Sequence, residues 1–442
     1  MGGTKPTAEA PRAPQPRVQA PPRPVPPVAA VPPQPQPPLP PQPQIQIQTL
    51  PPAPAPLATD KGGEVRAALL VPLSGQYASW GTALSNAAQL AMFEIADQRF
   101  NLIPLDTHGT AEGAAAAAQQ AVAQGADIVL GPLFSPEVKA AAPVARDQAV
   151  PMLAFTTDRA AAGGGVYAMG ILPGPQVERV VSFARTQGKN RFALLAPNSE
   201  YGRTVADALK AAVAANGAQL AKIEYYDPNA QDHSAVVRRF TDYDSRTRGR
   251  AKGSTDPVPP PPFDAVLLPD SGTRLRTISA LLTYYEVDPS EVKLLGTLLW
   301  DDPRLANEPA LNGGWYAAPP TADHQAFETR YGKAFGPLPS QQVGNVASLA
   351  YDATALAAKL AHGGQADYSA AALTNPNGFA GVDGIFRLMP DGQAQRGLAV
   401  REIVRGGSRE VSPAPAVFPA IMGATAPGVE ARVTPAAVPS GR

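Results

Sequence analysis

The side chains best suited to bind a small molecule stand where apolar segments of the sequence end. Ligands of α/β proteins gather at the carboxyl ends of strands, where loops and helix N-termini converge. Hydroxyl, carboxylate and aromatic groups at such ends are therefore the predicted ligand-binding residues. They are Ser74, Gly75, Tyr77, Phe134, Ser135, Thr156, Thr157, Tyr201, Asp270, Trp300 and Asp301.

Three of these residues could bind the two charged groups of an amino acid. A ligand carboxylate needs hydroxyls and free backbone N–H groups at a helix start, which Ser135 and Thr156 could supply. A ligand ammonium needs an acceptor from an opposite lobe, and Asp270 is the best-placed candidate. The sequence thus predicts a candidate amino-acid site.

Each of these residues also has a purely structural interpretation. Ser135 precedes a proline and fits a helix N-cap better than a ligand contact. Asp270 is followed by Ser271 and Gly272, so a turn or helix start is as plausible as a ligand acceptor. Tyr201 and Trp300 are aromatics beside tight turns, which usually close cores or hinges.

Catalysis has little support in the sequence. The four histidines, at positions 108, 233, 324 and 362, show no metal-binding spacing, and no nucleophile elbow or phosphate-binding loop is present. Asp301 and Asp302 could ligate a hard cation, but paired acids in a turn are ordinary. The chain has no cysteine, and its 37 basic residues equal its 37 acidic ones. We therefore expect no enzyme, no metal or other cofactor, and no nucleic-acid partner.

The elements that must position the binding residues form two series of short apolar segments. Predicted strands of the first series are 65–73, 101–106, 126–132 and 151–157; those of the second are 191–197, 218–226, 264–270 and 292–297. Their starts are 36, 25 and 25 residues apart in the first series and 27, 46 and 28 in the second. The spacing of 46 residues contains the basic, proline-rich insertion at 246–262. Without this insertion the spacing is 29 residues, so both series have βα periodicity. This pattern predicts two open, mostly parallel sheets wrapped by helices.

The remaining pieces are too few for a third lobe. They are a strand at 315–319, helices near 322–335 and 341–361, and a hairpin-like segment at 386–404. We expect them to complete the first two lobes, so that the chain crosses between lobes several times. The predicted first lobe is 64–171 with 321–365, and the second is 172–320 with 366–410, including a flexible insertion at 246–262.

Both ends of the chain are rich in proline. Residues 1–60 hold 21 prolines and residues 411–442 hold 6. Proline removes backbone donors, and few apolar side chains are available to bury, so we predict disordered segments at 1–63 and 411–442. The N-terminal segment is interpreted as a semi-rigid tether, in preference to a ligand for a proline-reading domain.

Several motifs resemble the leucine/isoleucine/valine-binding family of type I periplasmic binding proteins. The first is ALLVPLSGQYASWGTALSNAAQLAMFEI at 68–95; GADIVLGPLFSPEVKAAAPVARDQAVPMLAFTTD at 125–158 and RFALLAPNSEYGRTVADALKAA at 191–212 follow in the same order and spacing. The resemblance implies an α/β protein with two Rossmann-like lobes joined by a multi-crossover hinge. It also implies that Ser135 and Thr156 occupy ligand-binding positions.

Motifs of the second half resemble a narrower branch, the penicillin-binding-protein activators. They include FDAVLLPDSG at 263–272, LLGTLLWDDPRL at 294–305, GGWYAAPP at 313–320, SLAYDATALAAKLA at 348–361 and GFAGVDGIFRLMPDGQAQRGLAV at 378–400. The resemblance implies a periplasmic, outer-membrane lipoprotein whose partner is a peptidoglycan synthase. Such proteins carry a lipidated cysteine after a signal peptide, whereas this chain reads Met1-Gly2-Gly3 and has no cysteine. Membrane contact is therefore expected only through a lipid anchor that this chain does not contain.

Two functions follow as expectations. The first is a lipid-anchored regulator that activates a peptidoglycan synthase by protein contact, because a tether gives such a protein reach. The alternative is a solute-binding protein that delivers a branched-chain or other amino acid to an ABC transporter. Both use the same fold, so the fold alone cannot choose between them.

Overall fold

The computed structural model describes Gly2 and residues 63–251, 256–361 and 365–418. All elements described below belong to one unit, Asp60–Arg442. The predicted N-terminal tether, apart from Gly2 and Gly63, lies outside the described residues, as does most of the predicted C-terminal tail.

The first sheet has five parallel strands in the order β2-β1-β3-β4-β5. The strands are β1 (Val65–Val71), β2 (Phe100–Asp106), β3 (Ile128–Leu130), β4 (Met152–Ala154) and β5 (Val166–Ala168). Helices α1 (Ala78–Ile95), α2 (Ala111–Ala123) and α3 (Ser135–Asp147) connect them. The βα alternation therefore gives the expected parallel sheet.

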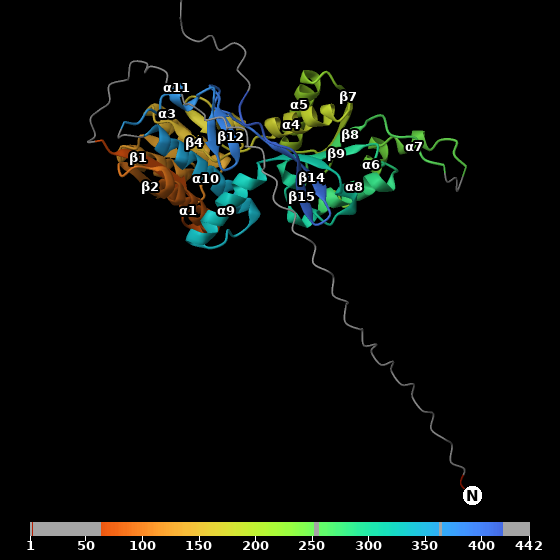
Figure 1. Cartoon of the computed structure of the whole chain (residues 1–442), viewed down its shortest axis with the longest axis horizontal. Helices are drawn as coiled ribbons and strands as arrows, with labels where there is room; N and C mark the ends of the chain where they lie inside the picture. The colour runs from red at the N-terminus through yellow and green to blue at the C-terminus, as the bar shows by residue number, and fades with distance from the viewer. Residues whose placement is uncertain (1, 3–62, 252–255, 362–364, 419–442) are drawn as a thin grey trace, which may run out of the picture. The chain divides into compact units, whose positions relative to one another are not determined.

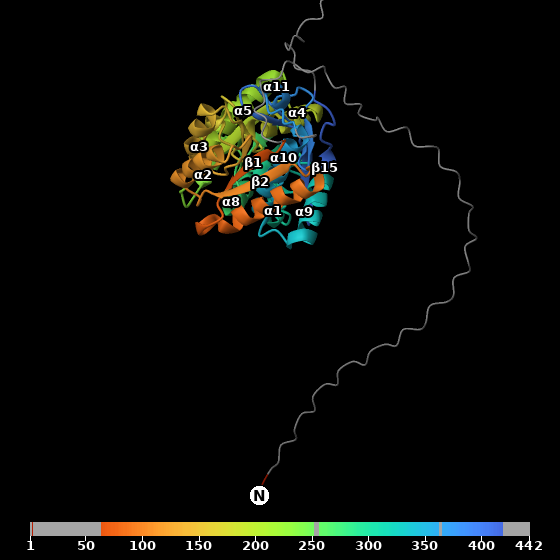
Figure 2. The same cartoon turned by 90° about the vertical axis from the view of Figure 1, so that its left-hand side faces the viewer.

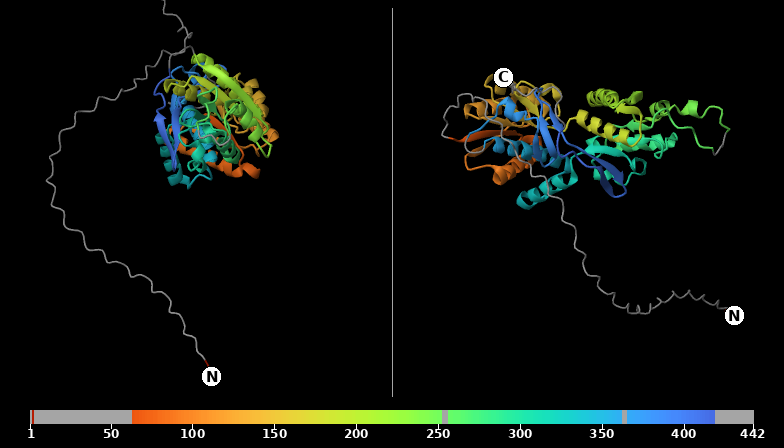
Figure 3. Two further views of the ribbon diagram at one scale, coloured as in Figure 1. Left: turned by 90° about the vertical axis from the view of Figure 1, so that its right-hand side faces the viewer. Right: turned by 45° about the horizontal axis from the view of Figure 1, so that its top comes forward.

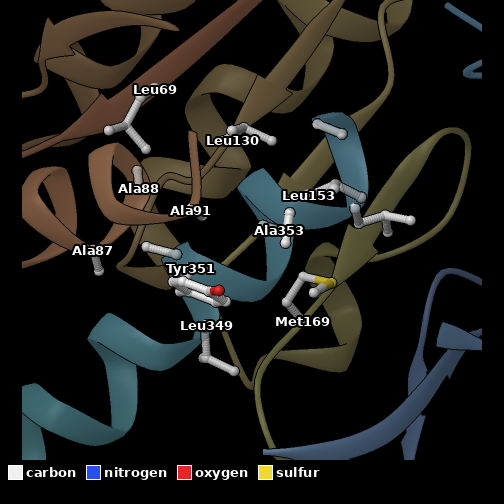
Figure 4. Packing of buried hydrophobic residues seen from close by; sticks show 14 of the residues in the cluster. Leu69, Ala87, Ala88, Ala91, Leu130, Leu153, Met169, Leu349, Tyr351 and Ala353 are labelled. Atoms are coloured by element: carbon white, nitrogen blue, oxygen red, sulfur yellow. The ribbon is translucent and has the colours of Figure 1, made fainter. Parts of the chain in front are cut away.

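Side chains of β1 alternate between two cores, one on each face of this sheet. Leu69 packs in a core shared with α1 and with α10 (Gln341–Leu360), whereas Leu70 packs with α2 and α3. In Figure 2, α2 and α3 lie on one side of β1 and β2, and α1 lies on the other. Figure 4 shows Ala88 and Ala91 of α1 near Ala353 of α10. These small side chains let two helices from distant parts of the chain approach closely over the sheet.

The second sheet has seven strands in the order β15-β14-β10-β9-β8-β6-β7. They are β6 (Arg191–Pro197), β7 (Gln219–Tyr226), β8 (Ala265–Leu267), β9 (Lys293–Gly296), β10 (Trp315–Ala318), β14 (Ala399–Val404) and β15 (Gly407–Ser412). The first five are parallel to one another, and β14 and β15 pair antiparallel. In the left view of Figure 3 the two blue strands lie at one edge of this sheet.

Helices cover both faces of the second sheet as well. Helices α4 (Pro173–Thr186) and α5 (Glu200–Ala215) pack on one face, and α6 (Ser234–Phe240) and α8 (Gly272–Tyr284) pack on the other. Helix α7 (Tyr243–Arg246) follows α6 and leads into the basic insertion (Figure 1). All nine predicted strands are present, and the α/β class with two mainly parallel sheets is confirmed.

The chain passes between the two sheets three times. The crossings follow β5, β10 and β13 (Ala394–Arg396), and the second leads into α9 (Thr321–Phe335). The first and third crossings touch, because Nη2 of Arg396 donates to the carbonyl of Met169 at 3.1 Å. Nη1 of Arg396 also lies 3.3 Å from the buried carboxylate of Asp352 on α10. The predicted multi-crossover connection is therefore present and held by buried polar contacts.

The C-terminal part differs from the predicted boundaries. Segment 366–410 was assigned to the second lobe, but Leu373 of α11 (Ala370–Leu373) and Phe386 of β12 (Gly384–Leu388) lie in the core of the first sheet. Strands β11 (Phe379–Gly381), β12 and β13 form a separate antiparallel sheet. Within segment 366–410, only residues from Leu398 onward pack in the core of the second sheet. Strand β15 also extends two residues into the segment 411–442 that was predicted to be disordered.

In both halves of the protein a glycine lets a helix pack closely against the end of a strand. A Cβ on Gly81 would lie 2.0 Å from the carbonyl oxygen of Pro72, and one on Gly202 would lie 2.0 Å from that of Pro197. Each glycine sits in the first turn or two of a helix, α1 or α5, that follows the first strand of its sheet. Glycine is thus required for the helix to pack on the strand end.

Candidate ligand-binding sites

Each of the two large sheets contains one point where the strand order reverses. In the first sheet β1 lies between β2 and β3, and in the second β6 lies between β7 and β8. Ligands of doubly wound sheets bind at such switch points, outside the carboxyl ends of the strands. Ser74 and Ser135 follow the two strands of the first switch point, and Tyr201 and Asp270 follow those of the second. The predicted residues therefore fall into two groups, one for each sheet.

Ser74 belongs to a hydroxyl, imidazole and carboxylate group at the first switch point. Its Oγ lies 2.6 Å from Nδ1 of His108, and the same nitrogen lies 3.0 Å from Oδ2 of Asp106. A catalytic serine relay needs the hydroxyl and the carboxylate on opposite ring nitrogens, so this arrangement is not one. Burial raises the pKa of Asp106, but hydrogen bonds from Ser74 and neighbouring backbone groups outweigh it, and the net pKa is lowered. Gly75 beside them has a φ of +77° that favours glycine.

Aromatic rings join the two loops of this switch point. The ring centroids of Tyr77 and Phe134 are 4.5 Å apart, with an interplanar angle of 51°. Both side chains are half-buried. This contact fixes the loop after β1 against the loop after β3.

Ser135 does not cap helix α3, so that prediction was wrong. Phe134 is the N-cap residue, and its N–H donates to Oε2 of Glu137 at 2.9 Å. The hydroxyl of Ser135 instead donates to the carboxylate of Asp158, which also lies 2.7 Å from Nζ of Lys139. Hydrogen bonds from Lys139 and then from Ser135 lower the pKa of Asp158.

The two threonines at the end of β4 have different environments. Thr156 is buried, and its hydroxyl oxygen accepts the N–H of Asp158 at 3.1 Å. Thr157 is exposed. Of the two, Thr157 has the side chain that is open to a ligand.

Tyr201 lies at the switch point of the second sheet. Its hydroxyl is 2.9 Å from Oγ1 of Thr297, which follows β9. Burial is the main cause that raises the pKa of Tyr201 to about 12, so the phenol is neutral at physiological pH. It can therefore offer a ligand a neutral hydroxyl rather than a charge.

Asp270 is occupied by its own neighbours. Its carboxylate accepts Nε of Arg274 at 2.5 Å, Nη2 of Arg274 at 2.8 Å and the N–H of Ser271 at 2.7 Å, and it also accepts the hydroxyl of Tyr226. The residue is only 3% exposed. The predicted role of Asp270 as a free acceptor for a ligand ammonium is therefore not supported by the geometry, and the helix-start interpretation fits.

Trp300 and Asp301 have different roles. Trp300 is buried, its Nε1 donates to the carbonyl of Leu268 at 3.0 Å, and its ring lies against Gly296, so it belongs to the core. Oδ1 of Asp301 accepts the hydroxyl of Tyr316 and Nη1 of Arg401, each at 2.9 Å. Asp301 lines a pocket, whereas Trp300 does not.

The pocket beside Asp301 has a volume of about 640 Å³. Its lining residues are Asp301, Thr321, His324, Gln325, Glu328, Gly332, Pro337, Leu338, Ser340 and Arg401. Of the predicted residues, only Asp301 is among them. The sequence contains a signal for this pocket that was missed. Polar residues at 321, 324, 325 and 328 share one face of α9.

Within 63–251, 256–361 and 365–418, no cluster of three or more histidine, aspartate or glutamate side chains could hold a metal ion. No helix in the same ranges is both long and apolar enough to cross a membrane.

Comparison with known proteins places the chain among binding proteins. Residues 64–408 match the profile of the family described as periplasmic binding protein. An uncharacterized protein, RP748, from Rickettsia prowazekii (strain Madrid E) is 20% identical over 229 residues, which is 52% of this chain and 59% of that protein. The chain thus spans less than two thirds of the length of this curated relative.

Solved structures share the fold at low sequence identity. A putative branched-chain amino acid ABC transporter protein from Rhodospirillum rubrum matches with a TM-score of 0.66 and 18% identity, covering 79% of this chain and 100% of that one. The branched-chain amino acid transporter substrate binding protein LivJ from Streptococcus pneumoniae, in complex with isoleucine, matches with a TM-score of 0.53 and 19% identity, covering 79% and 100%. These likenesses support the two-sheet architecture.

Proposed function

Because the chain belongs to the periplasmic binding protein family, we propose that it is a non-catalytic protein that binds a small polar solute outside the cytoplasm and presents it to an ABC transporter. The family consists of solute-binding proteins, and both similar structures described above carry transporter names. The observation that carries the proposal is the pair of matching switch points, with Ser74 at one and Tyr201 at the other. Thr157 follows β4, the strand next to β3 in the first sheet.

The chemistry of the switch points favours a ligand recognised through neutral hydrogen bonds. Asp270 is paired with Arg274, and Asp158 is paired with Lys139, so these two carboxylates already have cationic partners. The carboxylate of Asp106, beside Ser74, accepts the backbone N–H groups of Leu73 and His108. The hydroxyls of Ser74, Thr157 and Tyr201 remain as groups that can donate or accept. A solute with several hydrogen-bonding oxygens or amides fits this set better than one that needs a free carboxylate.

Calorimetric titration of the full chain against amino acids, amides and small carboxylic acids tests this proposal. We expect at least one compound to bind with micromolar affinity, and Tyr201→Phe to weaken it because a hydrogen bond is lost. Lys333→Gln, on the exposed face of α9, is the matched control and should leave the affinity unchanged. No binding by any compound would contradict the proposal.

A second candidate is a regulator that activates a peptidoglycan synthase by protein contact. The engagement of Asp270 by Arg274 and Tyr226 favours it, because the acceptor expected for an amino-acid ammonium is already saturated. The 21 prolines among residues 1–60 also suit a tether. In this case the protein would be a periplasmic lipoprotein in its native form.

Rate measurements on bifunctional peptidoglycan synthases separate the two candidates. The regulator predicts that adding the full chain raises the rate of glycan polymerisation or crosslinking without any solute. An unchanged rate across a panel of such enzymes, together with micromolar solute binding, would reject the regulator and leave the transport function.

A further inference from the structure

The pocket beside α9 is built from both halves of the protein. Helix α9, labelled in Figures 1 and 2, contributes Thr321, His324, Gln325 and Glu328 from one face, and its core side packs with the first sheet. Asp301 and Arg401 come from the second sheet side, after β9 and on β14. The pocket lining includes none of the switch-point residues Ser74, Ser135, Tyr201 and Asp270, so a ligand here is distinct from the one proposed above.

Both cations of the pocket are committed to carboxylates of the protein. Nη1 of Arg401 donates to Asp301 at 2.9 Å, and its Nη2 donates to the carbonyl of Pro319 at 2.8 Å. Nδ1 of His324 lies 2.7 Å from Oδ1 of the buried Asp383. Burial by itself lowers the pKa of His324, but hydrogen bonds to Asp383 and Glu328 outweigh it and raise the pKa to about 10. The imidazole is therefore charged at neutral pH and already neutralised by Asp383.

One carboxylate of the pocket lining is only loosely paired. Glu328 lines the pocket, its side chain is 39% exposed, and its Oε1 lies 3.6 Å from Nε2 of His324, which is longer than an ordinary hydrogen bond. Its pKa is lowered, mainly by its interaction with His324, so it is ionised. Among the lining residues, two cations, His324 and Arg401, face two carboxylates, Asp301 and Glu328. The buried Asp383 behind them pairs with His324 and also interacts with Arg396. Because His324 is paired with Asp383 and Arg401 with Asp301, Glu328 is the lining carboxylate that can attract a further cation.

A buried hydrogen-bond donor in the pocket wall also lacks an acceptor. Nε of Arg401 has no hydrogen-bond partner among the described residues, and this side chain is only 9% exposed. Leaving such a donor unpaired carries a desolvation cost. A ligand oxygen that reaches Arg401, after a small movement of its side chain, would remove that cost. Thr321, Gln325 and Ser340 add hydroxyl and amide groups beside it.

We propose that this pocket binds a small organic ammonium ion that also carries hydroxyl or carbonyl oxygens. The ammonium lies beside Glu328 and Asp301, and an oxygen of the same molecule accepts from Arg401. The volume of about 640 Å³ is within the usual range for small-molecule sites. A ligand so placed touches both α9 and β14, and therefore links the two halves of the protein.

The test uses calorimetry on the full chain with three probes in slightly acidic buffer. Glucosamine offers an ammonium and oxygens, 1,4-diaminobutane offers only ammonium groups, and glucose offers only oxygens. We expect glucosamine to bind at least about tenfold more tightly than either of the others, a difference of about 1.4 kcal/mol. Equal or absent binding of glucosamine relative to both other probes would overturn the proposal.

Variants locate the binding within the pocket. Glu328→Gln should weaken glucosamine binding at least about tenfold, because the carboxylate that attracts the ammonium is lost. Asp323→Asn, an exposed carboxylate on the same helix outside the pocket lining, is the matched control and should keep the affinity. Arg401→Lys should reduce the preference for glucosamine over 1,4-diaminobutane, because lysine has no Nε donor on the stem. If Arg401→Lys fails to fold, Glu328→Gln still tests the proposal. Unchanged glucosamine affinity in Glu328→Gln would contradict a binding site in this pocket.

Discussion

The carboxylate of Asp270 and the guanidinium of Arg274 form a two-pronged ion pair one helical turn apart. Nε of Arg274 is 2.5 Å from Oδ2, and Nη2 is 2.8 Å from Oδ1. The same carboxylate accepts the hydroxyl of Tyr226, whose pKa is raised chiefly by burial. Asp270 therefore fixes the start of α8 against β7, and its carboxylate is not a free acceptor for a ligand.

Replacing Asp270 should affect stability more than binding. Asp270→Asn leaves Arg274 and Tyr226 without their charged acceptor. Breaking a buried pair usually costs about 3–5 kcal/mol, and because the Arg274 side chain is 36% exposed we expect about 2–3 kcal/mol. Denaturant unfolding measures this loss. Asp244→Asn, which breaks the exposed pair with Arg238, is the matched control and should cost much less stability. Equal losses in the two variants would contradict the structural role of Asp270.

The paired glycines should be intolerant of a side chain. Gly81→Ala and Gly202→Ala each place a Cβ 2.0 Å from a backbone oxygen, so a helix must move away from its strand. We expect each variant to lose about 3 kcal/mol or more of unfolding free energy. Gly174→Ala, in the first turn of α4 with open space around the new Cβ, should be neutral or stabilise by about 0.4–1 kcal/mol. A wild-type melting temperature in Gly81→Ala and Gly202→Ala would contradict the close approach.

Stability should depend on pH through His324. Its pKa in the folded state, about 10, is above the value of about 6.5 for an unperturbed histidine. A raised pKa means that its contribution is fully present below about pH 6.5 and is lost as the pH rises towards 10. We expect the unfolding free energy of the wild type to fall over this range, as measured by urea unfolding at a series of pH values.

The variant His324→Gln isolates that contribution. It should be less stable than the wild type at pH 6, and its stability should change less between pH 6.5 and 10. His233→Gln, at a position where the ring contacts Tyr226 rather than a carboxylate, is the comparison for a general histidine effect. An identical pH profile in wild type and His324→Gln would rule out the charged pair with Asp383.

The main elements of the fold could be predicted because their patterns are local. Strands such as β6, predicted at 191–197 and found at Arg191–Pro197, combine an apolar run with clear turn signals. Strand β5 was missed because it has only three residues after a glycine loop, and β15 was missed because its polar sequence lacks apolar alternation. The association of β12 with the first core depends on long-range packing that periodicity does not encode.

The binding residues were harder to predict than the strands that carry them. The position of each residue at a strand end was correct, but the partner of each side chain comes from elsewhere in the chain. Ser135 meets Asp158, 23 residues away, and Asp301 meets Arg401, 100 residues away. The pocket on α9 was missed for the same reason, since His324 gains its charge from Asp383 in a different element.

The most direct test of the account is calorimetric titration of the full chain with a panel of polar solutes, repeated on Tyr201→Phe and Asp270→Asn. The account predicts micromolar binding of at least one solute, weakened by Tyr201→Phe but changed little by Asp270→Asn in the folded fraction. The opposite result, in which Asp270→Asn abolishes binding while Tyr201→Phe has no effect, would contradict it.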